Sequence, residues 1–257
     1  MDLALGMKFA TQDADMFLTN VAKLEQEGVT IGGFELQAMR RDTPETVVAA
    51  VDLVRSQFSP RFQGLHPPFP CYADNEFLKW DQISSDLKLD YTVLHAAVLR
   101  GDWAFLEHEV RRLTTQAKSQ AFLENIPLRL TQPTKICAGS LTETSRLHSL
   151  LLFDIPHAIH NFEHRFGDSP DPVEQVRREG SHLRAVHVAD NLESAGIVPV
   201  NGGSPMFQAI MAELFKLPGL WMVAEPKDGH LDGGRGHKDT CREIWKLWQA
   251  WKDNHKS

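Results

Sequence analysis

Short apolar segments alternate along the chain with longer segments in which hydrophobic residues recur at helical spacing. Eight short segments predict β-strands, at residues 3–7, 33–37, 62–66, 91–96, 121–125, 150–154, 185–188 and 221–225. Repeated strand–helix units build a parallel sheet, and eight such units in roughly 250 residues match a closed barrel. The pattern therefore predicts one domain over residues 1–257, a single (β/α)8 TIM barrel. An open doubly wound sheet is the alternative.

Helices are expected between these strands, at residues 15–26, 43–57, 102–118, 172–179, 205–215 and 239–251. Two of them have clear start signals. Thr43 precedes Pro44, and Ser204 precedes Pro205. Each pair places an N-cap hydroxyl before a proline at the first helical position.

Composition and charge narrow the classes of function. The chain has 257 residues, of which 42% are hydrophobic and 24% charged, as in an ordinary soluble globular protein. Its formal charge of -7 has the wrong sign for attracting a phosphate backbone, so we expect no nucleic-acid partner. Three widely spaced cysteines make no disulfide framework, and no segment reads as a membrane span. We expect a cytoplasmic protein with no membrane partner, and the sequence leaves a homo-oligomer open.

Polar side chains stand near the ends of seven predicted strands, where a buried parallel strand should be apolar. They are Glu35, His66, His95, Glu124, Asp154, His187 and Glu225. The carboxyl ends of barrel strands surround one cavity, so we expect these side chains to converge there. Several buried carboxylates without a cation would cost several kcal/mol per ion. A bound metal ion is the natural compensation.

Four of these residues make a candidate metal site. Glu124, Asp154, His187 and Glu225 belong to successive predicted strands and supply three carboxylates and one imidazole. Such a donor set suits one divalent ion, and the sequence does not choose among Mn²⁺, Co²⁺, Mg²⁺ and Zn²⁺. Any one of these residues alone would more often be structural, but four on consecutive strands favour a metal.

The order of these motifs resembles a known family. Phe-Leu-Glu124, Asp154-Ile-Pro-His157, His187-Val-Ala-Asp190 and Val-Ala-Glu225 look like the strand ends of the xylose-isomerase-like TIM barrel superfamily. This superfamily includes the sugar phosphate isomerases/epimerases and is related to the apurinic endonuclease family. The resemblance covers nearly the whole chain.

The resemblance implies an activity in carbohydrate metabolism. Epimerases of this superfamily bind one divalent ion, manganese among the candidates, through residues that correspond to Glu124, Asp154, His187 and Glu225. The two glutamates would serve as catalytic acid and base, and His157 would contact the substrate. The expected reaction is proton transfer beside the carbonyl of a sugar or sugar-like substrate, because a cation there stabilises the enediolate.

Three other functions stay open. A dehydratase of the same fold would eliminate water after the same proton abstraction. An endonuclease-type phosphodiesterase would use His66 and His95 as further metal ligands, but it also needs an Asp-x-His pair after strand seven, and no Asp or His occurs between Asn191 and Pro205. A non-catalytic sugar-binding barrel is the third alternative.

The remaining candidates are substrate-binding residues. His66 and His95 are expected to line the wall opposite the metal, as substrate contacts or as structural hydrogen-bond partners. Arg235 and Lys238 lie in the glycine-rich segment 227–238 after strand eight, where barrels often bind phosphate. Glu35 is expected to orient a metal ligand.

Overall fold

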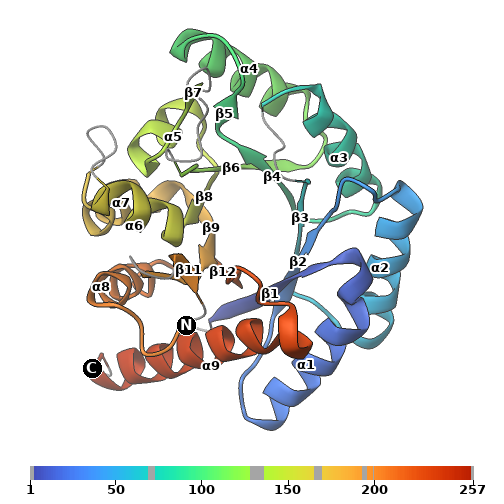
Figure 1. Cartoon of the computed structure of the whole chain (residues 1–257), viewed down its shortest axis with the longest axis vertical. Helices are drawn as coiled ribbons and strands as arrows, with labels where there is room; N and C mark the ends of the chain where they lie inside the picture. The colour runs from blue at the N-terminus through green and yellow to red at the C-terminus, as the bar shows by residue number, and fades with distance from the viewer. Residues whose placement is uncertain are drawn as a thin grey trace.

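The structure is a computed structural model that describes residues 3–68, 73–127, 136–164, 170–192, 196–198 and 200–255. Its centre is a closed parallel barrel in the order β1-β12-β9-β8-β6-β4-β3-β2, with β2 paired to β1 (Figure 1). The barrel strands are β1 (Ala4–Ala10), β2 (Gly33–Gln37), β3 (Phe62–His66), β4 (Tyr91–His95), β6 (Gln120–Glu124), β8 (Leu151–Asp154), β9 (Leu183–Val188) and β12 (Trp221–Ala224). The predicted (β/α)8 TIM barrel is confirmed.

The helices form a ring outside the strands, as Figure 1 shows. They are α1 (Ala14–Gln26), α2 (Pro44–Gln57), α3 (Asn75–Asp86), α4 (Trp103–Gln116), α5 (Leu141–Leu147), α6 (Ile155–Glu163), α7 (Pro172–Glu179), α8 (Pro205–Leu214) and α9 (Leu231–Asn254). In the described part of the chain, the 3-10 turns η1 (Thr11–Asp13) and η3 (Gly180–His182) lie beside α1 and α7. Two antiparallel pairs, β5 (Ala97–Val98) with β7 (Ile136–Cys137) and β10 (Asp190–Leu192) with β11 (Gly196–Val198), lie in the loops.

The expected helix starts are confirmed, and the sequence prediction missed three helices. The Thr43 hydroxyl accepts a hydrogen bond from Thr46 N, and the Ser204 hydroxyl accepts one from Phe207 N. Helices α3, α5 and α6 lie outside the ranges named from the sequence, although the repeated strand–helix units predict helices between the strands. Helix α9 spans Leu231–Asn254, but Asp232, Gly233 and Gly234 have left-handed φ angles and interrupt it with a kink, so its regular part follows Gly234 and still starts before residue 239.

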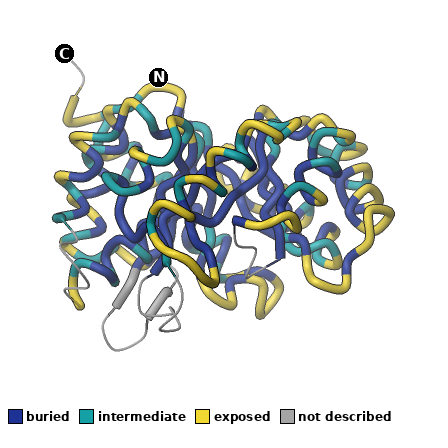
Figure 2. Tube along the Cα trace, turned by 90° about the horizontal axis from the view of Figure 1, so that it is seen from above, coloured by how far each residue is buried: buried dark blue, intermediate teal, exposed yellow. Residues whose placement is uncertain are grey.

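Apolar side chains fill two layers of the molecule. The larger layer lies between the barrel and the helices, and Figure 2 shows buried residues on the strands and on the inward sides of the helices. The smaller layer closes the barrel interior at the amino ends of the strands, where Phe62 stacks on Trp221 at 5.2 Å and Tyr91 stacks on Phe122 at 4.5 Å. Gly64 makes room for this aromatic floor, since a Cβ there would lie 2.2 Å from the Tyr91 ring.

None of the helices in the described parts of the chain combines the length and the apolar composition that a membrane span requires.

Candidate metal-binding active site

The seven polar strand-end residues meet inside the barrel, above the aromatic floor. Glu35, His66, His95, Glu124, Asp154 and His187 are all buried, and the side chain of Glu225 is 27% exposed. Each comes from a different strand end, so the closure of the barrel brings them together. The predicted convergence is therefore observed.

His187 lies at the centre of this group. Its Nδ1 is 2.7 Å from Glu225 Oε2, 3.4 Å from Glu124 Oε1 and 3.7 Å from Asp154 Oδ2. Its other ring nitrogen, Nε2, is 3.1 Å from Glu35 Oε2. The Nδ1 edge of the imidazole therefore faces all three carboxylates of the candidate metal site. The other ring nitrogen, Nε2, faces a fourth carboxylate, that of Glu35.

The residues fit a divalent ion. Glu124 Oε2, His187 Nδ1 and Glu225 Oε2 are buried and have no hydrogen-bond partner of regular geometry among the described residues. Ligand atoms of Glu124, Asp154 and His187 lie within 4.8 Å of one another. Unpaired buried oxygens and an imidazole nitrogen that face one point are the donors that Mn²⁺, Co²⁺, Mg²⁺ or Zn²⁺ would take. These buried groups could therefore hold a metal ion.

Glu35 lies beside the Nε2 side of His187, away from the other three carboxylates. It is fully buried, accepts a hydrogen bond from Tyr91 Oη at 2.8 Å, and has Lys8 Nζ 3.5 Å from its Oε1. Burial, together with the adjacent Glu35 carboxylate, raises the pKa of Tyr91, so the phenol keeps its proton and donates it in this hydrogen bond. A carboxylate that accepts from the outer nitrogen of a ligating histidine fixes the tautomer and the ring orientation. Glu35 lies where the sequence placed it.

Asn125 joins the ends of β6 and β8. Its side chain accepts from Asp154 N at 2.8 Å and donates to Asp154 O at 3.1 Å. Asp154 also caps α6, because its Oδ1 accepts from His157 N at 2.7 Å. Sequence reasoning missed α6 because the helix starts directly after the strand, with no loop between them.

His157 lines the mouth of the site with a defined tautomer. Its Nδ1 is 3.0 Å from the carbonyl oxygen of Asn125, which can only accept, so Nδ1 carries the hydrogen. In the neutral ring Nε2 then keeps its lone pair. That nitrogen can accept a hydrogen bond from a substrate hydroxyl, or donate one when the ring is protonated.

His66 and His95 form a wall behind Glu124. Their Nε2 atoms lie 3.3 Å apart, and both face Glu124 Oε2, at 3.5 Å from His66 and 3.1 Å from His95. The Nδ1 atom of His66 donates to Pro67 O at 2.9 Å, which leaves its Nε2 as the lone-pair nitrogen. The three residues form a second group that could hold a metal ion. Their expected contact with substrate stays a prediction.

The charges of the site are strongly coupled. Burial raises the pKa of Glu225, but the neighbouring His187 and Lys8 lower it further than burial raises it. Burial also raises the pKa of Glu124, but the interaction with His95 and hydrogen bonds from His187, His66 and His95 lower it well below its usual value. Burial lowers the pKa of His187, yet Glu225 and Glu35 raise it well above its usual value. The lowered pKa values keep Glu124 and Glu225 ionised, so both can attract a cation.

Lys8 is a residue that sequence reasoning missed. It lies on β1 directly opposite Glu35 in the strand register, is 6% exposed, and donates a hydrogen bond to Glu225 Oε1. Burial lowers its pKa, but Glu225, Glu35 and Glu124 raise it more, so the ammonium stays charged. The available signal was a charge within the apolar segment Leu-Ala-Leu-Gly-Met-Lys-Phe-Ala, the same signal that marked the other strands.

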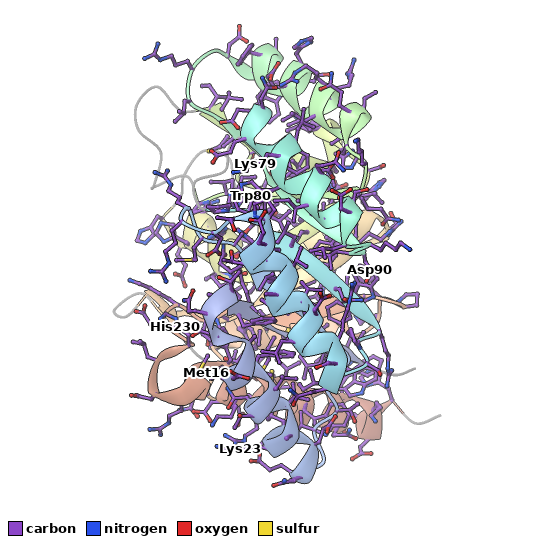
Figure 3. The ribbon with its side chains drawn as sticks, turned by 90° about the vertical axis from the view of Figure 1, so that its right-hand side faces the viewer. Met16, Lys23, Lys79, Trp80, Asp90 and His230 are labelled. Carbon is purple, nitrogen blue, oxygen red and sulfur yellow. The ribbon has the colours of Figure 1, made fainter. Side chains whose placement is uncertain are left out.

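A cavity of about 730 Å³ opens above the site at the carboxyl ends of β1, β2 and β12. Lys8, Asp154, His157 and Glu225 line it, together with residues of the loops after these strands. His230 also lines it, and Figure 3 places His230 at the opposite end of the barrel from Asp90, which precedes β4. The cavity is large enough for a sugar-sized ligand.

Arg235 and Lys238 lie on α9 and not in a loop, and neither is among the residues that line the cavity. The side chain of Arg235 is 75% exposed, and its Nε is 3.5 Å from Asp239 Oδ2 on the same helix. Their assignment to phosphate binding stays a prediction that the geometry does not support.

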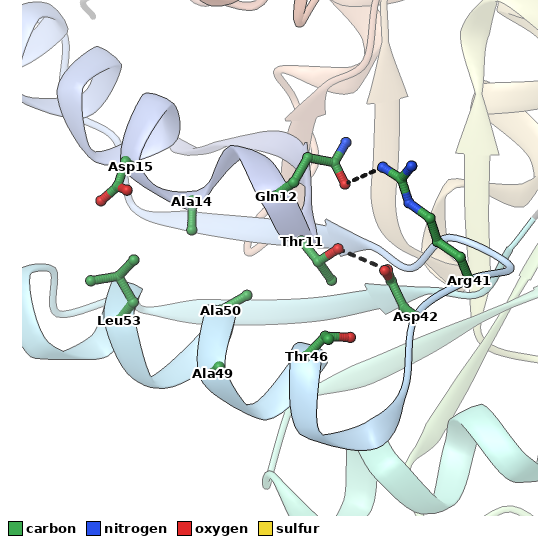
Figure 4. A pocket seen from close by; sticks show the side chains of 10 residues that line it. All are labelled: Thr11, Gln12, Ala14, Asp15, Arg41, Asp42, Thr46, Ala49, Ala50 and Leu53. Carbon is green, nitrogen blue, oxygen red and sulfur yellow. Dashed lines mark hydrogen bonds between the residues drawn. The ribbon is translucent and has the colours of Figure 1, made fainter.

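Another hollow lies between η1, α1 and α2 (Figure 4). Its polar groups are paired with one another: Thr11 Oγ1 donates to Asp42 Oδ2 at 2.8 Å, and Arg41 donates to Gln12 Oε1 at 3.3 Å. These groups satisfy each other, and none of the seven strand-end residues lines this hollow, so we assign no function to it.

Comparison with solved structures supports the barrel fold. No protein-family model matches the chain, and no curated protein matches it in sequence. Among solved structures, D-psicose 3-epimerase from Clostridium cellulolyticum H10, crystallised with D-tagatose, is 15% identical over 98% of both chains, with a TM-score of 0.62. The chain and this epimerase share the closed (β/α)8 barrel fold. The resemblance seen in the strand-end motifs is thus confirmed for the fold.

Other solved structures share this architecture with lower similarity. Tryptophan synthase subunit alpha from Legionella pneumophila is 11% identical over 98% of this chain and 94% of its own, with a TM-score of 0.51. N-acetylneuraminate lyase from Fusobacterium nucleatum is 8% identical over 98% and 80%, also with a TM-score of 0.51. Because proteins with different names share the barrel, function has to be argued from the side chains of the site.

Proposed function

We propose that this chain is a divalent-metal-dependent isomerase or epimerase of a sugar or sugar-like substrate. The observation that carries the proposal is the arrangement around His187 Nδ1, where Glu124, Asp154 and Glu225 converge from three other strands. A carboxylate-rich metal site with two glutamates and an adjoining cavity is suited to moving a proton beside a carbonyl group.

The chain's own residues would carry the proton transfer. A bound divalent ion would supply stabilisation of the negative charge that develops on the substrate oxygens. Glu225, which lines the cavity, would remove or return the proton, and Glu124 would act from the other side as the second acid or base. His157 Nε2 would position a substrate hydroxyl. The aromatic floor excludes water from below, which strengthens these interactions.

The structural similarity to a ketohexose epimerase that was crystallised with D-tagatose supports a sugar as substrate. The support is limited to the fold, so the position of the proton and the length of the sugar are left to experiment. The polyhydroxylated class itself is supported by the many polar groups at the base of the cavity, which can bind several hydroxyls at once.

One observation favours a second candidate, an endonuclease-type phosphodiesterase with more than one metal. His66, His95 and Glu124 could hold a further ion beside the first. The net charge of -7 opposes binding to DNA. A dehydratase would use the proposed site unchanged and differ only in the fate of the substrate.

The test is hydrogen exchange in deuterated water. The protein is purified without chelator, loaded in turn with Mn²⁺, Co²⁺, Mg²⁺ and Zn²⁺, and incubated with a panel of ketoses, aldoses and their phosphates. Mass spectrometry then detects deuterium in recovered sugar, epimer formation, or loss of water. Elemental analysis counts the metal, and cleavage of an abasic-site duplex tests the nuclease.

Metal-dependent deuterium incorporation with epimer or isomer formation supports the proposal. Loss of 18 mass units identifies a dehydratase. Two or three metals per chain with cleavage of the duplex identifies a nuclease. Absence of exchange across the whole panel with every metal would overturn the proposal.

A further inference from the structure

Lys8 places an ammonium group inside the barrel, where the rest of its strand is apolar. Its neighbours Met7 and Phe9 belong to the hydrophobic core, and Lys8 is 6% exposed. Burying an ammonium ion costs several kcal/mol unless charged partners compensate it. Glu225 and Glu35 supply this compensation, so the lysine and the two carboxylates form one buried charge cluster.

The contacts of Lys8 with the two glutamates account for two of its three hydrogen-bond donors. An ammonium group has three N–H donors. One bonds Glu225 Oε1, and a second faces Glu35 Oε1 at 3.5 Å. The described part of the chain shows no third acceptor for Nζ, and Lys8 is among the residues that line the cavity. A molecule in the cavity can therefore take the third hydrogen bond.

Glu225 places this free donor of Lys8 close to the atoms that would react. Its Oε2 faces His187 Nδ1 at 2.7 Å, while its Oε1 is held by Lys8. A substrate atom within reach of Glu225 Oε1 is consequently also close to the ammonium of Lys8. When negative charge moves from the Glu225 carboxylate to such a substrate atom, it therefore stays close to the Lys8 ammonium.

We propose that Lys8 is a catalytic residue that stabilises the substrate's enediolate oxygen while Glu225 holds the transferred proton. This inference rests on the proposed function. In the step, the substrate C–H bond breaks, its electron pair forms the C=C bond, and the carbonyl electrons move to the oxygen. The proton forms an O–H bond on Glu225. The negative charge thus passes from Glu225 to the substrate oxygen, and Lys8 remains its counter-ion throughout.

A purely structural role for Lys8 makes a different prediction. If the lysine only held Glu225 in place for the metal, its loss would weaken metal binding. If it serves the substrate oxygen, its loss removes a positive charge that repels the metal, so metal binding should be equal or tighter. Binding of an anion that mimics the enediolate should nevertheless weaken.

The experiment measures three dissociation constants by calorimetry for wild type, Lys8→Met, Lys8→Gln and Lys8→Arg. The probes are Mn²⁺ alone and, with Mn²⁺ bound, two matched sets: hydroxamates of four- to six-carbon sugar acids, which mimic the charged enediolate, and polyols of the same lengths, which are neutral. Lys246→Met, on the exposed side of α9, is the charge-matched control.

We expect Lys8→Met to bind Mn²⁺ no more weakly than wild type and to bind the hydroxamate about 10²-fold more weakly, the scale of a lost electrostatic contact to a transition-state oxygen. Polyol affinity should stay unchanged, and Lys8→Arg should recover part of the hydroxamate affinity. Lys8→Gln keeps a donor to Glu225 without the charge, so it should behave like Lys8→Met and serves if that variant does not fold.

Equal effects on hydroxamate and polyol, or a parallel loss of Mn²⁺ binding, would overturn the role of Lys8 and leave the proposed function standing. Failure of wild-type protein with bound Mn²⁺ to bind any hydroxamate or polyol would instead refute the proposed function, and the role of Lys8 with it.

Discussion

Two glutamates of the site have different surroundings. The Glu225 side chain is 27% exposed and bonded to Lys8, whereas that of Glu124 is 2% exposed and faces His66 and His95. We expect Glu225→Gln and Glu124→Gln each to lower kcat by roughly 10² or more, because glutamine keeps the shape but cannot accept the proton. Deuterium incorporation from each epimer, with metal saturated, would show which face each residue serves.

The control for these variants is Glu107→Gln, which changes an exposed glutamate of α4 that is paired with Arg111. It should keep wild-type turnover. If Glu124→Gln and Glu225→Gln also keep wild-type turnover with normal metal content, proton transfer must involve other groups, His157 among them.

Glu35 acts on the metal through His187. Glu35→Gln should weaken Mn²⁺ affinity by roughly 10- to 100-fold, the usual cost of losing a carboxylate behind a ligating histidine. Tyr91→Phe removes one donor to Glu35 and should have a smaller effect. Calorimetric titration with Mn²⁺ measures both, and equal affinities in wild type and Glu35→Gln would show that His187 needs no support from this carboxylate.

At the scale of elements, His237 ties α9 to the barrel. It is 7% exposed, and its Nδ1 donates to Ala224 O on β12 at 3.1 Å. Burial lowers the pKa of His237 to about 4, from 6.5 in the unfolded chain. Between these values the unfolded state binds more protons, so the contribution of His237 to stability is complete above pH 6.5 and is lost as the pH falls toward 4.

The expected loss is about 3 kcal/mol for a shift of this size. Urea unfolding of metal-free wild type and His237→Gln, at pH 7 and pH 4.5, measures it. The stability advantage of wild type should shrink toward the lower pH. A difference between the two proteins that does not change with pH would mean that His237 takes up its proton as readily in the fold as in the unfolded chain.

At the scale of the whole molecule, the metal should stabilise the fold. The ligands come from β6, β8, β9 and from the residue after β12, so an ion joins segments that are 101 positions apart in the chain, from residue 124 to residue 225. A ligand at 100 times its Kd adds about 2.7 kcal/mol, which for a domain of this size corresponds to a rise in Tm of roughly 5–10 °C.

Thermal unfolding with Mn²⁺ and with chelator tests this expectation. Asp154→Asn, which keeps an oxygen to cap α6, is the matched variant and should lose most of the metal-dependent rise. The rise should depend on Mn²⁺ concentration in wild type. An identical rise in Asp154→Asn would place the stabilising ion elsewhere.

The sequence by itself determined the number and the order of the barrel strands. Their apolar runs and turn residues are local properties of contiguous segments, so the predicted ranges 33–37 and 62–66 coincide with β2 and β3. It also indicated the convergence of polar residues, because strand ends in a parallel barrel all face one side. Helix α5 was not named because it is only seven residues long, and α6 was not named because it begins directly at the end of β8, where no loop marks a helix start.

Only the tertiary structure decided which polar groups became partners. Lys8 and Glu225 are 217 positions apart in the chain, and nothing local to either residue reveals their hydrogen bond. The same holds for the hydrogen bond between Tyr91 and Glu35. It also holds for the ring orientation of His187, which directs Nδ1 to the carboxylates and Nε2 to Glu35. These pairings follow from strand register and barrel closure, which depend on the packing of the whole chain and not on the periodicity of any one segment.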